Sequence, residues 1–183
     1  MKPKYNISQD EVSAEIDLTE LFGVKVNDAD TRRLIAEDLI QKMIDRNDNN
    51  LGVNISSGKE VKLKSPYSKE YSESLTFKAH DKSRGDVNMK LTGSMRASID
   101  LISDSSKKLK IGIDNEDTPK AFNHQTGDTV TKRPFFGVTK DDLNEIRDKY
   151  IDEVVPQAIT AGDIFSKDNF AAVFKAMKKS GVI

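Results

Sequence analysis

The chain has 183 residues and nearly balanced charge, with 29 Lys and Arg against 30 Asp and Glu. This length predicts a single domain of ordinary size with a real core. The charge balance offers no basic surface for holding phosphates, which argues against sequence-specific DNA binding. The chain contains no cysteine, which excludes disulfides and thiolate metal sites, and no apolar run long enough to span a bilayer, so a soluble protein with no membrane partner is expected.

The first 27 residues are expected to form an N-terminal arm. Within it, residues 12–18 alternate apolar and polar, which is typical of a short strand or of a segment ordered only against a partner. From Asp28 to Arg46 the apolar residues recur at helical spacing, with acidic residues near the start, so a long helix is predicted. Its apolar face consists of Ile35, Leu39, Ile40, Met43 and Ile44.

Residues 47–64 are rich in Asn, Gly and Ser, which predicts a loop or a loose hairpin with Val61 and Leu63 as strand positions. A short helix is predicted next, because Ser65 can cap it and Pro66 suits its first position.

Aromatic residues mark this predicted helix. Tyr67, Tyr71 and Leu75 fall at i, i+4 and i+8, so they share one helical face. The polar stretch at 78–90 is long for a connection in a compact domain, and such connections usually carry function or an intermolecular contact. Tyr67, Tyr71 and Phe77 are therefore candidate subunit-interface residues.

A further helix and two strands are expected downstream. Thr92 can cap a helix whose apolar stripe is Met95, Ile99 and Ile102. The stretch at 107–115 alternates at Leu109, Ile111 and Ile113, which predicts a half-buried strand. Residues 129–138 predict a second strand, and Pro134 indicates an edge or strand-end position because it lacks an amide donor.

The clearest local pattern begins at Thr139. Thr139 and Asp142 have the spacing of a capping box, and Val138 can pack on Leu143 as a hydrophobic staple. A helix is therefore predicted from about Lys140 and should end at Pro156. A C-terminal helix is expected beyond it, with an apolar face at Phe170, Val173, Phe174 and Met177.

The segment from Ala121 to Gly137 reads AFNHQTGDTVTKRPFFG and contains one of only two histidines. His124 could act as a general base oriented by Asp128 or Asp114, with Ser94 or Ser98 as nucleophile. No motif joins these residues, so His124 is interpreted as a hydrogen-bonding strut in a turn, together with Gln125, and not as a catalytic residue.

The two phenylalanines in this segment raise a packing question. Adjacent residues of a strand point to opposite faces, so Phe135 and Phe136 cannot both fill the same side. One is expected to anchor the core, and Phe136 is a candidate for contact with a neighbouring subunit.

Metal and cofactor motifs are absent from the sequence. The acidic run at 114–117 lacks the spacing of a calcium loop, the histidines have no zinc-site spacing, and the glycines form no nucleotide-binding cradle. No metal, no cofactor and no enzymatic activity are therefore expected.

Residues 90–150 resemble the phage virion-morphogenesis family, the tail-completion and head–tail-joining proteins of tailed bacteriophages. The resemblance begins in LTGSMRASI at Leu91, Gly93 and Met95, and continues through AFNHQTG and RPFFGVTKDDLNEI. It rests further on Ala121, His124, Gln125, Gly127, Arg133, Pro134, Phe135, Gly137, Asp141 and Asp142. Two positions depart from the family pattern, where Lys120 replaces an aromatic residue and Thr131 replaces a proline.

The resemblance implies an α+β subunit, with a small mixed sheet flanked by helices and with arms or loops for subunit contacts. The expected organisation is an arm at 1–27, a tail-completion-like domain at 28–155 and a helical extension at 156–183. Such subunits form rings, commonly hexameric, in the neck of the virion, where they meet connector and tail-tube proteins and DNA passes through. The residues leave two alternatives open, a small hydrolase that uses His124 and a monomeric protein-binding adaptor.

Overall fold

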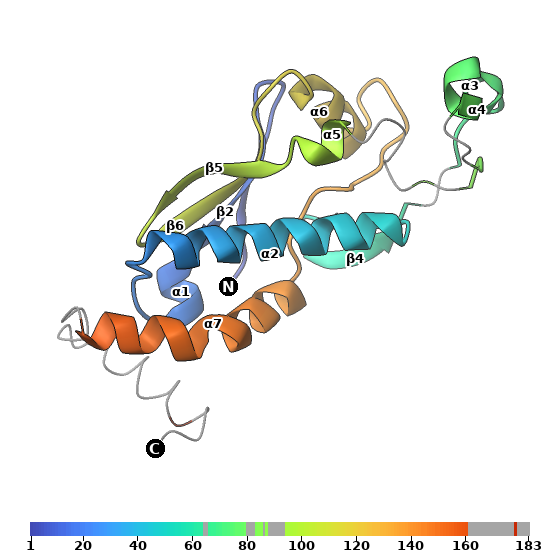
Figure 1. Ribbon diagram of the computed structural model, residues 1–183. Helices are drawn as coiled ribbons and strands as arrows, with labels where there is room; N and C mark the ends of the chain where they lie inside the picture. Colours follow the sequence, from blue (N-terminus) through green and yellow to red (C-terminus); the bar gives the residue numbers. More distant parts are fainter. Residues whose placement is uncertain (64–65, 80–82, 86, 88–93, 161–177, 179–183) are drawn as a thin grey trace.

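The computed structural model of the chain describes residues 1–63, 66–79, 83–85, 87, 94–160 and 178 (Figure 1). Helices surround a small antiparallel sheet, which confirms the predicted α+β class. The helices within these ranges are α1 Leu18–Phe22, α2 Ala29–Asp48, α3 Lys69–Glu73, α4 Leu75–Ala79, α5 Ser94–Ala97, α6 Thr118–Thr126 and α7 Lys140–Thr160.

The main sheet has four strands in the order β1-β2-β6-β5. Its strands are β1 Lys4–Ile7, β2 Val12–Asp17, β5 Asp100–Ser105 and β6 Lys108–Ile113. Every pairing is antiparallel, so the predicted mixed sheet is wrong in this detail. Residues 1–27 supply the first two strands, so the expected N-terminal arm is an integral part of the sheet.

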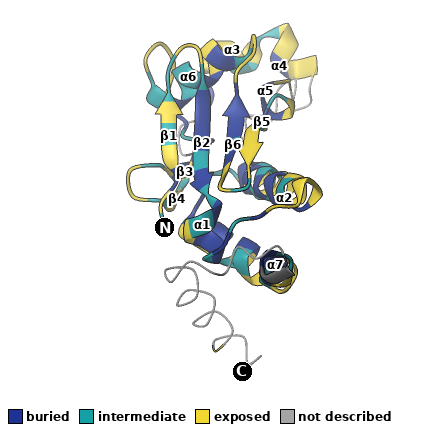
Figure 2. Cartoon of the chain, turned by 90° about the vertical axis from the view of Figure 1, so that its left-hand side faces the viewer, coloured by how far each residue is buried: buried dark blue, intermediate teal, exposed yellow. Residues whose placement is uncertain are grey.

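One face of the sheet forms the core. The paired strands β2 and β6 bring buried apolar residues opposite one another, which confirms the period-two pattern predicted for β6. The pairs are Val12 with Ile113, Ala14 with Ile111 and Ile16 with Leu109, and all six side chains are fully buried. Figure 2 shows these two central strands as buried and the edge strands β1 and β5 as more exposed.

Helix α2 lies across the core face and meets α7 beyond the sheet (Figure 1). The Asp28 carboxylate caps it by accepting from the Thr31 amide at 2.7 Å. Ile35, Leu39 and Met43 are buried, so the predicted helix and most of its apolar face are confirmed.

The short helix α1 was not predicted, although both of its ends carry recognisable signals. Asp17 accepts from the amides of Thr19 and Glu20 at 2.9 and 3.0 Å, and Gly23 closes the helix with a φ of 77°. The predicted hairpin at 47–64 is present, with β3 Leu51–Asn54 paired to β4 Lys59–Lys62.

The predicted helix through Ile102 is wrong in its second half. Helix α5 ends at Ala97, and Ile102 lies in β5, beside the irregular register between Leu101 and Ser103. The strand forms because β6 offers its backbone groups along that edge, and this tertiary pairing outweighs the helical spacing of the apolar residues. The predicted cap Thr92 lies outside the described residues, as does the apolar face predicted for the C-terminal helix at Phe170, Val173, Phe174 and Met177.

Helix α7 continues through Pro156 to Thr160, so the predicted stop at Pro156 is wrong. A proline inside a helix loses one backbone hydrogen bond. The buried side chains of Val154, Val155 and Ala158 lie on both sides of it, and their burial offsets that cost.

Candidate functional site

Residues 128–139 join α6 to α7 as an extended segment, which we call the strap. The strap belongs to no sheet, so the strand predicted at 129–138 is wrong. Its residues up to Lys132 are exposed, whereas most of those from Arg133 onward are buried. Buried backbone groups need hydrogen-bond partners. In the strap these partners are mainly side chains, and in one case a backbone amide, of residues distant in the sequence.

Helix α6 leads into the strap and contains two of the motif residues. His124 and Gln125 therefore lie on a helix and not in the turn that the sequence suggested. Pro119 near the start and Gly127 at the end, with a φ of 81°, are the signals that could have revealed this helix. A Cβ on Gly127 would lie 2.7 Å from the Lys132 Cβ, so this corner requires glycine.

Gln125 holds the buried part of the strap. Its Nε2 donates to the Phe136 carbonyl at 3.0 Å, and its Oε1 accepts from the Phe136 amide at 3.2 Å. The side chain thus replaces both hydrogen bonds that a neighbouring strand would make. The predicted role of Gln125 as a hydrogen-bonding tie is confirmed, with the strap as its partner.

His124 lies on the same helix and is half-buried. Its backbone carbonyl accepts from the Arg133 amide at 2.7 Å, and its buried Nδ1 has no hydrogen-bond partner. Burial is the main cause that lowers the pKa of His124 to about 4, and the nearby positive charges of Arg133 and Lys120 lower it further. A hydrogen bond to the Thr131 backbone favours the charged form and opposes part of this shift. The imidazole is therefore neutral at pH 7.

Of the two serines considered as nucleophiles, Ser98 has other partners. The Ser98 hydroxyl lies 2.9 Å from the Asp117 carboxylate and 2.9 Å from the Ser94 carbonyl. These contacts connect α5 to the start of α6.

Phe135 and Phe136 are both fully buried within their own chain. Their ring centroids are 6.4 Å apart with an interplanar angle of 65°, an edge-to-face arrangement that aromatic pairs favour. The anchoring role is confirmed, but Phe136 as a subunit-interface residue is wrong, because the chain itself covers it.

The strap is also tied to β1 and to the β3–β4 hairpin. The Tyr5 hydroxyl bridges the Val138 amide and carbonyl at 3.1 Å each. The Val53 amide donates to the Pro134 carbonyl at 2.8 Å. A Cβ on Gly137 would lie 2.8 Å from the Val53 Cβ, so a glycine is needed where the strap crosses the hairpin.

The strap ends in the predicted capping box. The Asp142 amide donates to the Thr139 hydroxyl at 3.0 Å, and the Thr139 amide donates to the Asp142 carboxylate at 2.7 Å. Arg46 at the end of α2 donates to the same carboxylate and to the Gly137 carbonyl at 3.1 Å, and its Nε binds Glu60 at 3.0 Å. Arg46 thus joins α2, the strap, β4 and α7, a role that the sequence did not indicate.

Residues 66–79, which we call the arm, project from the rest of the chain (Figure 1). Ser68 caps α3 by accepting from the Tyr71 amide at 3.1 Å, and Ser74 separates α3 from α4. The predicted single helix is therefore broken, and the predicted cap Ser65 lies outside the described residues.

The aromatic residues of the arm pack against one another. The rings of Tyr67, Tyr71 and Phe77 lie with centroids 5.3 to 5.4 Å apart, and the Arg133 guanidinium lies 4.7 Å from the Tyr67 centroid. Tyr67 and Phe77 are buried, so they are wrong as exposed interface candidates, whereas Tyr71 is 39% exposed. Leu75 is 88% exposed, although its spacing had placed it with the packed tyrosines.

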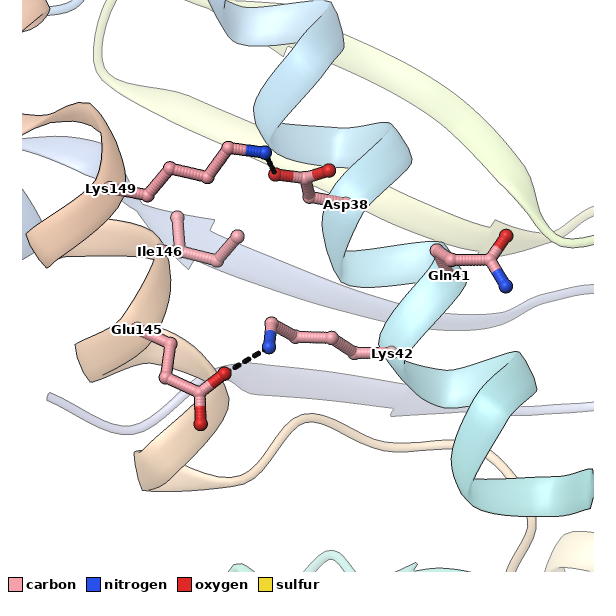
Figure 3. A pocket seen from close by; sticks show the side chains of 6 residues that line it. All are labelled: Asp38, Gln41, Lys42, Glu145, Ile146 and Lys149. Carbon is pink, nitrogen blue, oxygen red and sulfur yellow. Dashed lines mark hydrogen bonds and ion pairs between the residues drawn. The ribbon is translucent and has the colours of Figure 1, made fainter. Parts of the chain in front are cut away.

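A groove of about 330 Å³ lies between α2 and α7 (Figure 3). Ile146 lies between two ion pairs that connect the helices, Lys149 with Asp38 and Lys42 with Glu145. The Tyr150 hydroxyl donates to Asp38 at 2.8 Å. Each lysine has an acidic partner, so the groove has a rim of alternating charge around the buried Ile146.

The described ranges contain no cluster of His, Cys, Asp or Glu that could hold a metal ion, and none of their helices has the length and apolar character needed to cross a membrane. Comparison of the chain with protein-family models, curated proteins and solved structures gives no match.

Proposed function

We propose that this chain is a structural subunit of a tailed phage, which assembles with copies of itself into a ring at the head–tail junction. The observation that carries the proposal is the use of the motif residues. The motif residues that resemble the virion-morphogenesis family include Gln125, which holds the strap, and Asp142, which caps the start of α7. Residues used in this way support a scaffold role.

The exposed arm also supports assembly. Large apolar side chains that remain exposed in groups mark interaction sites. Tyr71 and Leu75 are both exposed on one projecting segment. In a ring, a projecting segment of one subunit can contact a different surface of the next, which is the heterologous contact that cyclic symmetry requires.

The paired lysines of β6 fit the passage of DNA through such a ring. Lys108 pairs with Glu15 at 2.8 Å, and Lys110 pairs with Glu11 at 2.6 Å. Lysines neutralised in this way bind phosphate weakly, because tight binding to DNA depends on many uncompensated cationic contacts.

Electron microscopy and light scattering of the purified protein test the proposal. The expected result is a closed ring of defined mass, and virion neck and tail proteins should co-purify with it from infected cells. A monomer at all concentrations with one tight protein partner would favour the adaptor alternative. A hydrolytic activity lost in His124→Ala, with assembly intact, would favour the hydrolase.

A further inference from the structure

We propose that the arm of one copy docks into the α2–α7 groove of a second copy, with Leu75 as the inserted side chain. This inference rests on the proposed ring and identifies the surfaces that form it.

The exposed apolar residues indicate both halves of the contact. In the described part of the chain, the exposed large apolar side chains are Leu34, Tyr71, Leu75 and Val130. Tyr71 and Leu75 lie on the arm. Leu34 is 47% exposed on α2, one turn before Asp38 and two turns before Gln41, so it lies on the helix face that borders the groove.

The groove has the shape and chemistry to receive such a side chain. Its volume of about 330 Å³ has room for a leucine, and the buried Ile146 lies at its base (Figure 3). Leu34 extends the apolar surface at the border. An aliphatic anchor in a pocket with a polar rim is the usual centre of a protein interface.

The charges of the two surfaces are mixed in sign and balanced within each surface. The groove rim carries Asp38, Lys42, Glu145 and Lys149 in alternating sign. The arm carries an equally mixed set, Lys69, Glu70, Glu73 and Lys78. The charges within each surface balance, since each groove lysine pairs with an acidic residue of the facing helix and Lys69 lies 3.9 Å from Glu73, so no net repulsion opposes the contact.

The occupant must come from another copy. The arm projects from the molecule at the opposite end from α7 in both views (Figures 1 and 2), so it cannot reach the groove of its own chain. Arm and groove are different surfaces, and a contact between two copies leaves one copy with a free groove and the other with a free arm. Such heterologous contacts propagate from copy to copy, and they form the proposed ring when the rotation between neighbours closes.

Aspartate substitutions test the contact in the full-length chain. Leu75→Asp and Leu34→Asp should each weaken self-association about tenfold or more, measured by light scattering over a concentration series. Val130→Asp, at the remaining exposed apolar residue outside both surfaces, should assemble like wild type. All three positions are exposed, so circular dichroism and thermal melting should show unchanged folding.

Because the chain has no cysteine, introduced cysteines report the contact directly. A mixture of Leu75→Cys and Gln41→Cys subunits should form a disulfide between the two types in the assembled state, whereas Leu75→Cys mixed with Lys4→Cys should not. A ring that forms normally with Leu75→Asp would overturn this inference while leaving the proposed function standing. Leu75→Cys linked only to itself would also overturn it, and a wild-type protein that never assembles would overturn both proposals.

Discussion

Arg46 and Asp142 lie 96 residues apart in the chain, yet the Arg46 guanidinium binds the carboxylate that caps α7. The same carboxylate accepts from the Thr139 amide. The side chain of Arg46 is 4% exposed and that of Asp142 is 12% exposed. The end of one long helix is thereby fixed to the start of another, with the strap held between them.

Replacing Arg46 with methionine should therefore destabilise the fold strongly. The substitution keeps most of the aliphatic volume but leaves the Asp142 carboxylate and the Gly137 carbonyl without their cationic donor. Removing one partner of a buried pair costs about 3–5 kcal/mol, and we expect about 3 kcal/mol in urea unfolding because Asp142 keeps its cap contacts. Arg147→Met removes an exposed contact to the neighbouring Asp148 and should cost less than about 1 kcal/mol. Equal losses in the two variants would contradict the role of Arg46.

Short-range patterns were the part of the fold that the sequence could reveal. The capping box at Thr139 depends on residues three apart, and the alternation in β6 depends on residues two apart, so both are visible in a short window. Arg46 looked like the end of a surface helix because its partners are 14 to 96 residues away.

The strand predicted at 129–138 was wrong for a related reason. The buried residues of the strap look like a strand, but a strand also needs a neighbour with free backbone groups, and that neighbour is not encoded locally. Here Gln125 and Tyr5 supply the hydrogen bonds instead. The exposure of Leu75 could not be predicted from the spacing either, because α3 ends at Glu73 with Ser74 as its cap, and Leu75 does not continue the helical face of Tyr71.

Gln125→Met tests whether this side chain substitutes for a missing strand. The variant keeps a similar volume but leaves the Phe136 amide and carbonyl buried without partners. Each of these two unsatisfied buried groups costs about 1–3 kcal/mol, so the free energy of unfolding should fall by about 2–6 kcal/mol. Gln41→Met, on the exposed face of α2, should change it by less than about 0.5 kcal/mol. A loss below about 1 kcal/mol in Gln125→Met would show that the strap does not depend on these bonds.

Gly52→Ala tests the close approach of the β3–β4 hairpin to the strap. A Cβ at Gly52 would lie 2.0 Å from the Pro134 carbonyl oxygen, which belongs to the backbone and cannot rotate away. The hairpin must therefore move from the strap, weakening the Val53 hydrogen bond, and we expect a loss of about 1–3 kcal/mol. At Gly85 the nearest atom is 3.9 Å away, so Gly85→Ala should be within about 0.5 kcal/mol of wild type in the same unfolding measurement.

The pKa of His124 predicts how stability depends on pH. The pKa is lowered to about 4 in the folded chain, whereas an unfolded histidine titrates near 6.5. Between these values the unfolded chain binds one more proton than the folded chain, so stability falls as the pH falls from about 6.5 to about 4. The contribution is at most about 1.4 kcal/mol per pH unit, and it is constant outside this window.

His124→Gln replaces the titrating imidazole with an amide that does not titrate, while keeping a polar side chain of similar length. Its free energy of unfolding should therefore decline less steeply than that of wild type between about pH 6.5 and 4, and the two slopes should agree above pH 7. Carboxylates titrate in both proteins, so the difference between the slopes isolates His124. Parallel wild-type and His124→Gln curves throughout would mean that His124 accepts its proton as easily in the folded chain as in the unfolded one, against the burial and the Arg133 charge that surround it.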